Sequence, residues 1–550
     1  MASPLRIVPI GGCGEIGKNM TAFEYGRNIL LVDAGIMFPE NDMLGIDFII
    51  PDWQYLRDKR DLIRAIVVTH GHEDHTGALP YLLRDGFNAP IYATKLTRGL
   101  LEVKLKQHKV FEEANLNTIV AGEMLTVGPF KMEFFRVAHS IPDGVGLGIT
   151  TPAGLIVHSG DFKFDHTPVD GKPTDFAKLA EFGGRGVLAL MSDSTNADQP
   201  GTTPSERVID EAFDRVYREA QGRIIIGTFA SLISRIQQAA NAAMRYRRRM
   251  AIAGTSMAEN VRMAQKLGYL AFPDDLIVRL DEAARLRPRD VVIMATGTQG
   301  EPSSVLARVA AGEHSQIKVQ RGDTVIMSSH PVPGNEEMVH RTINRLFQRG
   351  AEVLYDPIEM VHVSGHASQE EQKLMLNLVR PEHFIPIHGE LRHLHAHARL
   401  ARLVGVEPPN IHVVENGYPI EFDEGEARIG ERVPGGYVYV DGSGVGDVGP
   451  SVLRERELLG RDGFVMAIVH RDPENGRLLD TPDIVTRGFV YTREAEDLLE
   501  GATQAVIDIV EANGRASQEA IRDKVEKSLR EYLYGETKRR PMIMAVVRDL

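Results

Sequence analysis

Short apolar runs alternate with polar turns over the first 200 residues of the chain. Each run is rich in branched side chains and is followed at once by a glycine or a polar residue. This pattern is typical of buried strands that present polar side chains at their ends. The predicted strands lie at residues 29–32, 65–68, 134–137, 155–157 and 187–191.

The pattern changes near residue 205, where longer helical stretches begin to separate the apolar runs. Ser205 follows Pro204 and can cap a helix over residues 205–220. The alternation of strands and helices that follows is the rhythm of a βαβ domain. It comprises predicted strands at 223–226, 291–295 and 324–327 and predicted helices at 231–249 and 335–349.

Residues 435–449 are rich in glycine and valine and read as a strand followed by a loop or linker. A charged, helix-rich stretch over 494–536 precedes an apolar strand at 542–547. We therefore expect one α/β domain with a second α/β domain inserted into it, followed by a small α/β tail. The predicted boundaries are 1–205 and 356–430 for the two parts of the outer domain, 206–355 for the inserted domain, 431–455 for a linker and 456–550 for a C-terminal domain.

Composition narrows the class of protein. Apolar residues make up 43% and charged residues 25% of the 550 residues, as in ordinary soluble globular proteins. The net charge of −13 excludes nucleic-acid binding through bulk positive charge, so a polyanion would need a local cleft or a metal. A single cysteine excludes an internal disulfide framework and fits a reducing compartment. Neither a signal peptide nor an 18-residue apolar run is evident, so we expect a cytoplasmic protein without membrane contact.

The strongest chemical signal is the segment 69–75, Thr-His-Gly-His-Glu-Asp-His, which directly follows the predicted strand at 65–68. Three imidazoles and two carboxylates this close together would cost several kcal/mol to bury without partners. Imidazole nitrogen and carboxylate oxygen suit Zn²⁺, or Mn²⁺ where oxygen dominates. His70 and His72 can converge on one ion, while Asp74 and His75 can serve a second.

Three further candidate ligands each follow a predicted strand: His139, Asp161 and His388. A single histidine after an apolar run is more often a packed or capping residue. Together with segment 69–75, however, the three predict a dinuclear site. The expected sets are His70, His72 and His139 on one ion, Asp74, His75 and His388 on the other, and Asp161 between them.

The His-x-His-x-Asp-His string, the later ligands and the aspartate at the end of strand 29–32, Asp33, resemble the metallo-β-lactamase superfamily. The resemblance implies an αβ/βα sandwich with two metals at its edge. It also implies that Asp33 orients a ligand rather than binding metal itself.

Two more segments resemble the β-CASP nuclease group of that superfamily: 192–196, Ser-Asp-Ser-Thr-Asn, and 361–368, Val-His-Val-Ser-Gly-His-Ala-Ser. The inserted α/β domain fits the same group. Asp193, His366 and His388 would then occupy its three motif positions. In that group a histidine at the third position goes with RNA substrates, so His388 favours RNA.

The segments 9–20, 386–390, 446–449 and 537–542 are similar to the bacterial ribonuclease J family, almost residue for residue at the N-terminus. The similarity covers the whole chain, with Cys13 as a mild departure from a plain apolar residue. It implies a 5′-to-3′ exonuclease that prefers 5′-monophosphate ends and has additional endonuclease activity, acting in RNA decay and maturation. It also implies a homodimer or homotetramer formed through the tail, and protein partners in RNA decay.

The segment 361–368 also offers donors for a phosphate. Ser364 and Gly365 lie between two histidines and supply a hydroxyl and a backbone N–H, and His362 adds a donor that can carry charge. Ser231 begins the predicted helix 231–249, where a helix N-terminus favours phosphate, although Ser231 can equally be an ordinary N-cap. The resemblance implies that the 5′-phosphate of RNA is held by Ser231, His362, Val363, Ser364, Gly365 and His366.

Chemistry assigns three residues a more direct part in hydrolysis. Asp161 would fix the spacing of two metals, which polarise phosphate and activate water. His366 is our candidate for the proton donor to the leaving oxygen, oriented by Asp193. The resemblance further suggests a structural Ca²⁺ at Gly45, Asp47 and Asp447, although Asp47 and Asp447 can equally cap turns. The other histidines, such as His393, His395 and His397, are expected on the surface of a helix.

Two other functions share part of this pattern. A hydrolase of a small ester, thioester or lactam would use the same metal site but would not need the inserted domain or His366. A non-catalytic RNA-binding or assembly subunit would have a degenerate metal site, whereas every expected ligand is present here.

Overall fold

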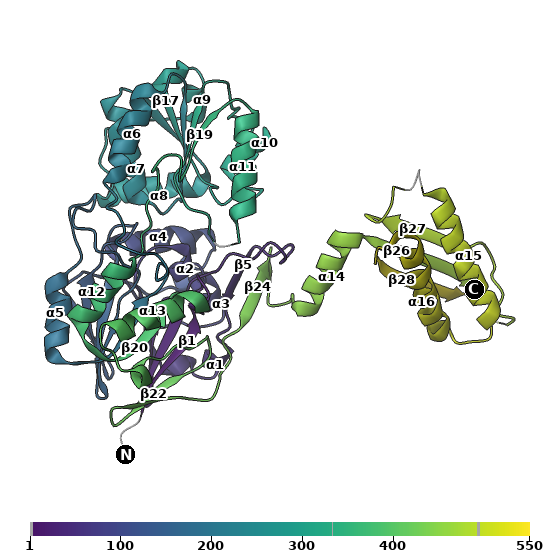
Figure 1. The fold of residues 1–550 in the computed structure, drawn as a ribbon, viewed down its shortest axis with the longest axis horizontal. Helices are drawn as coiled ribbons and strands as arrows, with labels where there is room; N and C mark the ends of the chain where they lie inside the picture. The colour runs from purple at the N-terminus through teal and green to yellow at the C-terminus, as the bar shows by residue number, and fades with distance from the viewer. Residues whose placement is uncertain (1–3, 333, 473, 492–494) are drawn as a thin grey trace. The chain divides into compact units, whose positions relative to one another are not determined.

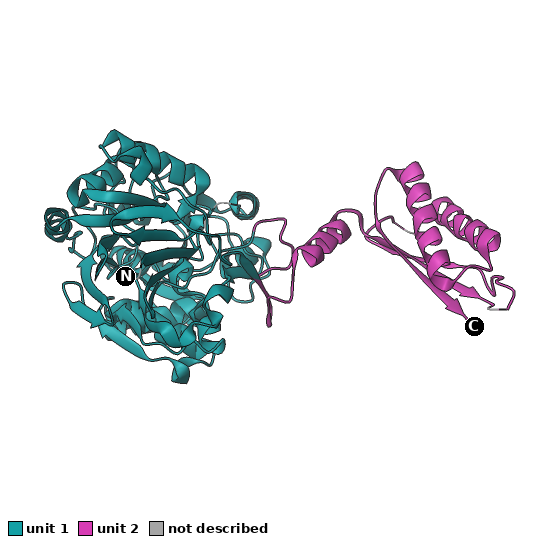
Figure 2. Cartoon of the chain, turned by 90° about the horizontal axis from the view of Figure 1, so that it is seen from below, with its two compact units in different colours: residues 1–39, 48–438 teal, residues 40–47, 439–550 magenta. Residues whose placement is uncertain are grey.

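The computed structural model describes residues 4–332, 334–472, 474–491 and 495–550. It divides into two compact units, residues 1–39 with 48–438 and residues 40–47 with 439–550, which Figure 2 colours separately. Strands and helices interleave in both units, so the predicted α/β class is confirmed.

Two mixed sheets form the centre of the first unit. Their inner faces share one core, in which Phe23 and Val32 from one sheet lie with Phe134 and Ile156 from the other. The first sheet has the order β23 (Glu426–Ile429), β22 (Ile420–Asp423), β1 (Leu5–Gly11), β3 (Met20–Tyr25), β4 (Asn28–Val32), β6 (Ile63–Val68), β7 (Ile91–Thr94), β8 (Leu116–Ile119). The second has the order β20 (Pro381–Ile387), β13 (Val187–Asp193), β12 (Gly154–His158), β11 (Val145–Thr151), β10 (Phe130–Arg136), β9 (Met124–Val127).

Helices cover the outer faces of both sheets. On the first sheet, α4 (Lys95–Gln107) contacts β7 and β8. On the second, a separate apolar core joins the sheet to α5 (Phe176–Arg185), α12 (Gln369–Val379) and α13 (Leu391–Leu403). The predicted αβ/βα sandwich is therefore confirmed.

The inserted domain is a parallel sheet with helices on both faces (Figure 1). Alternate side chains of its central strand point to opposite faces: Ile224 and Ile226 enter one core, and Ile225 the other. The strand order is β16 (Ile277–Val278), β15 (Arg249–Ala253), β17 (Val291–Ala295), β14 (Ile224–Gly227), β18 (Thr324–Met327), β19 (Glu352–Leu354). One face carries α6 (Val208–Glu219), α7 (Ile233–Arg245) and α8 (Thr255–Leu267); the other carries α10 (Val305–Ala311) and α11 (Glu336–Gln348).

The second unit contains a small sheet, with β26 (Phe464–Arg471) antiparallel to β27 (Asp483–Arg487) and parallel to β28 (Met542–Asp549). Alternate residues of β26 are buried against α15 (Glu496–Asn513) and α16 (Gln518–Thr537). Before this sheet lie β24 (Tyr437–Asp441), β25 (Gly444–Val445) and α14 (Pro450–Asp462). Residue 494, where the helix-rich stretch was predicted to begin, lies outside the described residues.

One predicted helix was too long. The helix expected over 231–249 is α7, which ends at Arg245, and Arg249 already begins β15. Arg247 has a positive φ of 55°, which breaks the helical path, and the guanidinium of Arg248 donates to the carbonyl of Ala220 (2.6 Å). Among the described residues, no helix combines the length and the apolar character that crossing a membrane requires.

Candidate metal centre

Polar side chains gather where several strands of the sandwich end. His70 follows β6, Asp161 follows β12 and His388 follows β20, while His139 lies beyond the end of β10. The strands that end here belong to both facing sheets. The edge of the sandwich therefore collects candidate ligands that are more than 300 residues apart in the chain.

His70, His72 and His139 form the first group. His72 Nδ1 lies 3.0 Å from His70 Nε2 and 3.1 Å from His139 Nε2. A proton on His72 Nδ1 can serve only one of these two contacts, whereas a cation between the rings would bind all three imidazoles. Zinc bonds of about 2.0–2.1 Å in tetrahedral geometry place ligand nitrogens at about this separation.

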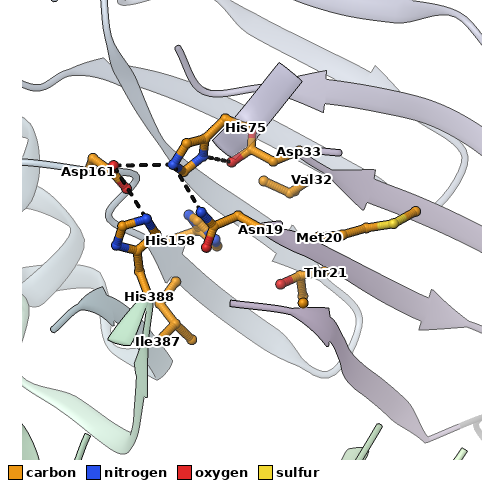
Figure 3. Close-up of a pocket in the computed structure, with 11 residues that line it drawn as sticks. Asn19, Met20, Thr21, Val32, Asp33, His75, His158, Asp161, Ile387 and His388 are labelled. Carbon is orange, nitrogen blue, oxygen red and sulfur yellow. Dashed lines mark hydrogen bonds and ion pairs between the residues drawn. The ribbon is translucent and has the colours of Figure 1, made fainter. Parts of the chain in front are cut away.

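Asp74, His75 and His388 form the second group, which Figure 3 shows in part. Asp74 Oδ2 lies 3.2 Å from His388 Nε2 and 3.5 Å from His75 Nε2. The donor set of imidazole nitrogen and carboxylate oxygen again fits Zn²⁺ or Mn²⁺.

Asp161 lies between the two groups. Its Oδ2 is 3.2 Å from His75 Nε2 and 3.7 Å from His388 Nε2 on one side. On the other side it is 3.6 Å from His70 Nε2 and 3.9 Å from His139 Nε2. This is the position that a bridging carboxylate requires.

The outward-facing nitrogens of three histidines are also fixed. Asp33 Oδ2 lies 2.8 Å from His75 Nδ1, the Gly365 carbonyl 2.8 Å from His139 Nδ1, and Thr195 Oγ1 2.6 Å from His388 Nδ1. Such partners select the tautomer and aim the opposite nitrogen at a metal. Asp33 therefore contacts the candidate ligand His75, and its orienting role stays a prediction.

Burial and neighbouring charges divide the histidines into two kinds. Burial lowers the pKa values of His70 and His139 well below the ordinary value for histidine. Burial also lowers the pKa of His72, to about 4, so these three rings are neutral. Burial also disfavours charge on His388, but Asp161 and the nearby aspartates outweigh it and raise the pKa of His388 to about 10. The carboxylates that hold a proton there would hold a metal cation in its place.

Two residues of the site adopt left-handed backbone conformations that are uncommon for residues other than glycine. Asp33 has a φ of 63° and His388 a φ of 52°. Such conformations cost on the order of 1–3 kcal/mol and persist where the surroundings dictate them. The side chains are thus placed by the fold against local preference.

The second motif lies directly beside the ligands. His366 Nδ1 is 2.7 Å from Asp193 Oδ2 and 4.0 Å from Asp161 Oδ2. Burial acts against a charge on His366, but Asp193 outweighs it, so the pKa of His366 is raised. The structure thus brings together the three predicted motif residues, since Asp193 Oδ1 also lies 3.5 Å from His388 Nδ1.

The loop 361–366 joins this motif to the first group of ligands. A Cβ at Gly365 would lie 2.5 Å from His139 Cε1, so only glycine allows this approach. Ser364 Oγ accepts hydrogen bonds from Asn196 Nδ2 (2.9 Å) and from the His366 N–H (3.2 Å). Because both acceptor positions are engaged, the hydroxyl hydrogen of Ser364 is left for another acceptor.

The structure says less about the predicted phosphate-binding residue Ser231 and the predicted calcium site. Helix α7 begins at Ile233 with Leu232 at its N-cap, so the interpretation of Ser231 as an ordinary N-cap is wrong. Asp47 accepts a hydrogen bond from the Gly442 N–H (2.8 Å), the kind of bond that the turn-capping alternative requires. Calcium at Gly45, Asp47 and Asp447 stays a prediction.

The expectation that His393, His395 and His397 decorate a surface was wrong for two of the three. His393 is 3% exposed and His397 is fully buried, whereas His395 is exposed. His393 and His397 are four residues apart and so share the face of α13 that packs inward. His397 Nδ1 lies 3.0 Å from Ser194 Oγ, next to Asp193.

Three residues near the site were not predicted to act there. Asn19 Nδ2 lies 3.2 Å from His75 Nε2 (Figure 3), and Thr195 Oγ1 contacts both Asp193 and His388. His158 lines the same small pocket as His75 and His388. Asn19 and Thr195 both occur inside motif segments, which was the available signal, whereas His158 had none beyond its position at a strand end.

Comparison with known proteins gives four matches to family models. Residues 13–197 match the metallo-beta-lactamase superfamily, and residues 350–414 match the Zn-dependent metallo-hydrolase RNA specificity domain. Residues 221–346 match the ribonuclease J beta-CASP domain, and residues 451–550 match the ribonuclease J C-terminal domain.

Full-length relatives agree with these models. The chain is 42% identical to ribonuclease J2 of Bacillus subtilis, over 99% of each chain. It is 43% identical to ribonuclease J 1 of Streptococcus pyogenes (98% of this chain, 97% of the relative) and 44% identical to ribonuclease J of Thermus thermophilus (99% and 95%).

A solved structure of a protein of unknown function from Enterococcus faecalis V583 supports the fold alone, with a TM-score of 0.53 at 15% identity over 76% of this chain and 100% of that one. The family itself is shown by the relatives and the family models. On these grounds the chain belongs to the ribonuclease J family, in the β-CASP group of the metallo-β-lactamase superfamily.

Proposed function

We propose that this protein is a metal-dependent ribonuclease that removes nucleotides from 5′-monophosphate ends of RNA and also cuts internally, in RNA decay and maturation. One observation carries the proposal. The donor loop 361–366 is bonded directly to the metal centre, through the Gly365 carbonyl and His139 Nδ1 at 2.8 Å. A phosphate held by this loop would lie beside the groups that cleave the next phosphodiester.

The ligand sets fit two ions, Zn²⁺ or Mn²⁺. His70, His72 and His139 would hold one, Asp74, His75 and His388 the other, and Asp161 would contact both. Two such ions, when bound, supply activation of water and neutralisation of charge on phosphoryl oxygens.

His366 would give a proton to the leaving oxygen. Its Nδ1 faces Asp193, which fixes the ring and leaves Nε2 for the substrate. Burial acts against a charge on His366, but Asp193 raises its pKa, which favours the protonated form of the ring. The side chain is 19% exposed, so a substrate can reach it.

The 5′-phosphate would be held by neutral donors. The hydroxyl hydrogen of Ser364 is uncommitted, and His362 Nδ1 is buried without a hydrogen-bond partner in the part of the chain that the structure describes. Burial, with Arg235 nearby, lowers the pKa of His362 well below its ordinary value, so this ring is neutral and carries a single N–H. Ser231, Val363 and the Gly365 N–H complete the proposed subsite.

A time course on one RNA with a 5′-monophosphate, a 5′-triphosphate or a 5′-hydroxyl, with metal and with chelator, tests the proposal. We expect mononucleotides to be released fastest from the monophosphate end, and only with metal. Internal cuts that ignore the 5′ end would make the protein chiefly an endonuclease. Absence of cleavage would favour a small-ester hydrolase, which the donor loop does not support.

The C-terminal domain is our candidate for self-association into a homodimer or homotetramer. Helices α15 and α16 cover one face of its three-stranded sheet, while Met544 of β28 is 47% exposed. Light scattering on a chain that ends near Gly449 should show a smaller species than the full chain does. If the truncated and the full-length protein form assemblies with the same number of chains, this role is excluded.

A further inference from the structure

Two buried cations meet where the inserted domain joins the sandwich. Lys163 comes from the segment after β12 and Arg235 from α7 of the inserted domain, and their exposed fractions are 0% and 1%. Glu206, which is 4% exposed, joins them: its Oε1 lies 3.4 Å from Lys163 Nζ and its Oε2 2.8 Å from Arg235 Nη2. Each buried ion costs several kcal/mol in desolvation, whereas apolar side chains would fill the same space without this penalty.

Each cation also donates to a main-chain carbonyl of the loop 361–366. Arg235 Nη1 donates to the Val361 carbonyl (2.9 Å), and Lys163 Nζ donates to the Ser364 carbonyl (3.1 Å). Arg235 also donates to Ser328 Oγ, whose own hydroxyl donates to the same Val361 carbonyl (2.6 Å).

Two further carbonyls of the loop are engaged in the same way. The Gly365 carbonyl meets His139, and the His366 carbonyl accepts from Asn196 Nδ2 (3.1 Å) and Thr203 Oγ1 (2.6 Å). The carbonyl oxygens of residues 361, 364, 365 and 366 are thus all committed to donors of the protein. Carbonyl oxygens repel an anion, so holding them in these bonds keeps the loop fit to receive a phosphate.

Lys163 is also tied to the metal centre through its backbone. It lies two residues after Asp161, and its N–H donates to the Ala138 carbonyl (2.8 Å), next to His139. The cluster therefore connects three things: segments that supply metal ligands, the donor loop, and the first turn of α7 in the inserted domain.

We infer that Lys163, Glu206 and Arg235 are positioning residues that set the distance between the 5′-phosphate subsite and the metal centre. This inference rests on the proposed function and adds to it the means by which the 5′ end is read. Among the described residues, neither Arg235 nor Glu206 makes a hydrogen bond or ion pair with a proposed metal ligand. Damage to the cluster should therefore impair recognition of the 5′-phosphate more than cleavage of the phosphodiester.

The test compares Glu206→Gln, Arg235→Met and Arg235→Lys in the full-length, metal-loaded protein. Glu206→Gln keeps the shape of the side chain but removes the carboxylate that pairs with both Lys163 and Arg235. Among the described residues, Arg235 then has no ion pair, and Lys163 has only Asp165, whose Oδ2 lies 4.0 Å from Lys163 Nζ. Arg248→Met is the matched control, because Arg248 is also a buried arginine of the inserted domain (5% exposed) that donates to carbonyls, of Gly222 (2.8 Å) and Ala220, but has no hydrogen bond to the loop.

Three quantities are measured: kcat and KM on 5′-monophosphate RNA, the same on 5′-hydroxyl RNA, and the rate of cutting a circular RNA. For Glu206→Gln and Arg235→Met we expect KM on monophosphate RNA to rise and the preference for monophosphate to fall about tenfold, the equivalent of about 1.4 kcal/mol. Circular RNA should be cut at nearly the wild-type rate. Arg235→Lys should restore part of the preference for monophosphate RNA. Arg248→Met should lower thermal stability but leave that preference unchanged.

The outcomes separate this inference from the function on which it rests. A wild-type protein without any monophosphate preference would overturn both. A wild-type protein with that preference, together with Glu206→Gln and Arg235→Met variants that retain it, would overturn the positioning role alone. If Arg235→Met does not fold, Glu206→Gln and Arg235→Lys still test the positioning role. An equal loss of circular-RNA cleavage in these variants would show that the cluster serves general stability instead.

Discussion

Strand β20 carries one buried histidine near its start, His383, and presents another, His388, just beyond its end. His383 Nδ1 lies 3.1 Å from His412 Nε2, and its Nε2 lies 3.2 Å from the Gly425 carbonyl. No carboxylate appears among the ion pairs of His383 or His412 in the described part of the chain. His388, in contrast, lies within 4 Å of Asp74, Asp161 and Asp193.

The two histidine sites differ in charge because of these carboxylates. Burial, reinforced by His383, lowers the pKa of His412 to about 4, so His412 is a neutral part of the core. At His388 burial acts in the same direction, yet the aspartates raise its pKa to about 10. The carboxylates that converge on His388 mark it as a candidate metal ligand, whereas His383 contacts only a second histidine and a main-chain carbonyl.

Replacing the central carboxylate should have the largest effect. Asp161→Asn removes the negative charge that faces four histidines but keeps the shape of the side chain. We expect RNA cleavage to fall by at least ~1,000-fold, or ~4 kcal/mol of barrier, with loss of bound metal. Single-turnover rates and elemental analysis measure this, and a variant with wild-type metal content and rate would refute the bridging role.

A smaller loss is expected when an orienting carboxylate is changed. Asp33→Asn keeps a side chain beside His75 Nδ1 but no longer favours the tautomer that aims Nε2 at the metal. Changes of this kind typically lower metal affinity or activity about 10–100-fold. Competition with a chelator gives the affinity, and an unchanged value would show that His75 needs no orienting partner.

The core pair should respond in stability rather than in activity. His412→Ala leaves His383 Nδ1 without its partner, which should cost about 1–3 kcal/mol of unfolding free energy. Urea unfolding measures the loss. Metal content and RNA cleavage per folded molecule should equal those of the wild type; a fall in either would mean that the two ends of β20 are not independent.

The difference in protonation predicts a calorimetric signal. In the metal-free protein the pKa of His75 is raised well above its ordinary value and that of His388 to about 10, so both carry protons near neutral pH. Metal binding must displace those protons, and affinity should therefore rise with pH up to about 10. Titrations in buffers of different ionisation enthalpy should show release of about two protons, and no release would contradict the raised pKa values.

The sequence predicted those parts of the molecule that depend on local pattern. The strands at 291–295 and 324–327 were predicted at the bounds that the structure shows, because each is a buried run that is apolar except for Thr324. The clustering of the candidate histidine and aspartate ligands was predictable, because few other roles accommodate so many polar groups at strand ends.

Features that depend on distant parts of the chain could not be predicted. The end of α7 depends on the left-handed backbone at Arg247 and on carbonyls that Arg248 reaches in another segment. The burial of His397 depends on which face of α13 meets the sheet. The Lys163–Glu206–Arg235 cluster joins residues 43 and 29 positions apart, and only the packing of the two domains brings them together.

The proposed function requires that carboxylates and histidines at the sandwich edge hold two metal ions that support cleavage of RNA. The most direct measurement titrates Zn²⁺ or Mn²⁺ into chelator-treated protein and follows bound metal per chain together with release of nucleotides from 5′-monophosphate RNA. We predict that activity is absent without metal and reaches its plateau at two ions per chain. Full cleavage by the metal-free protein, or a plateau reached with no more than one ion bound, would contradict the account.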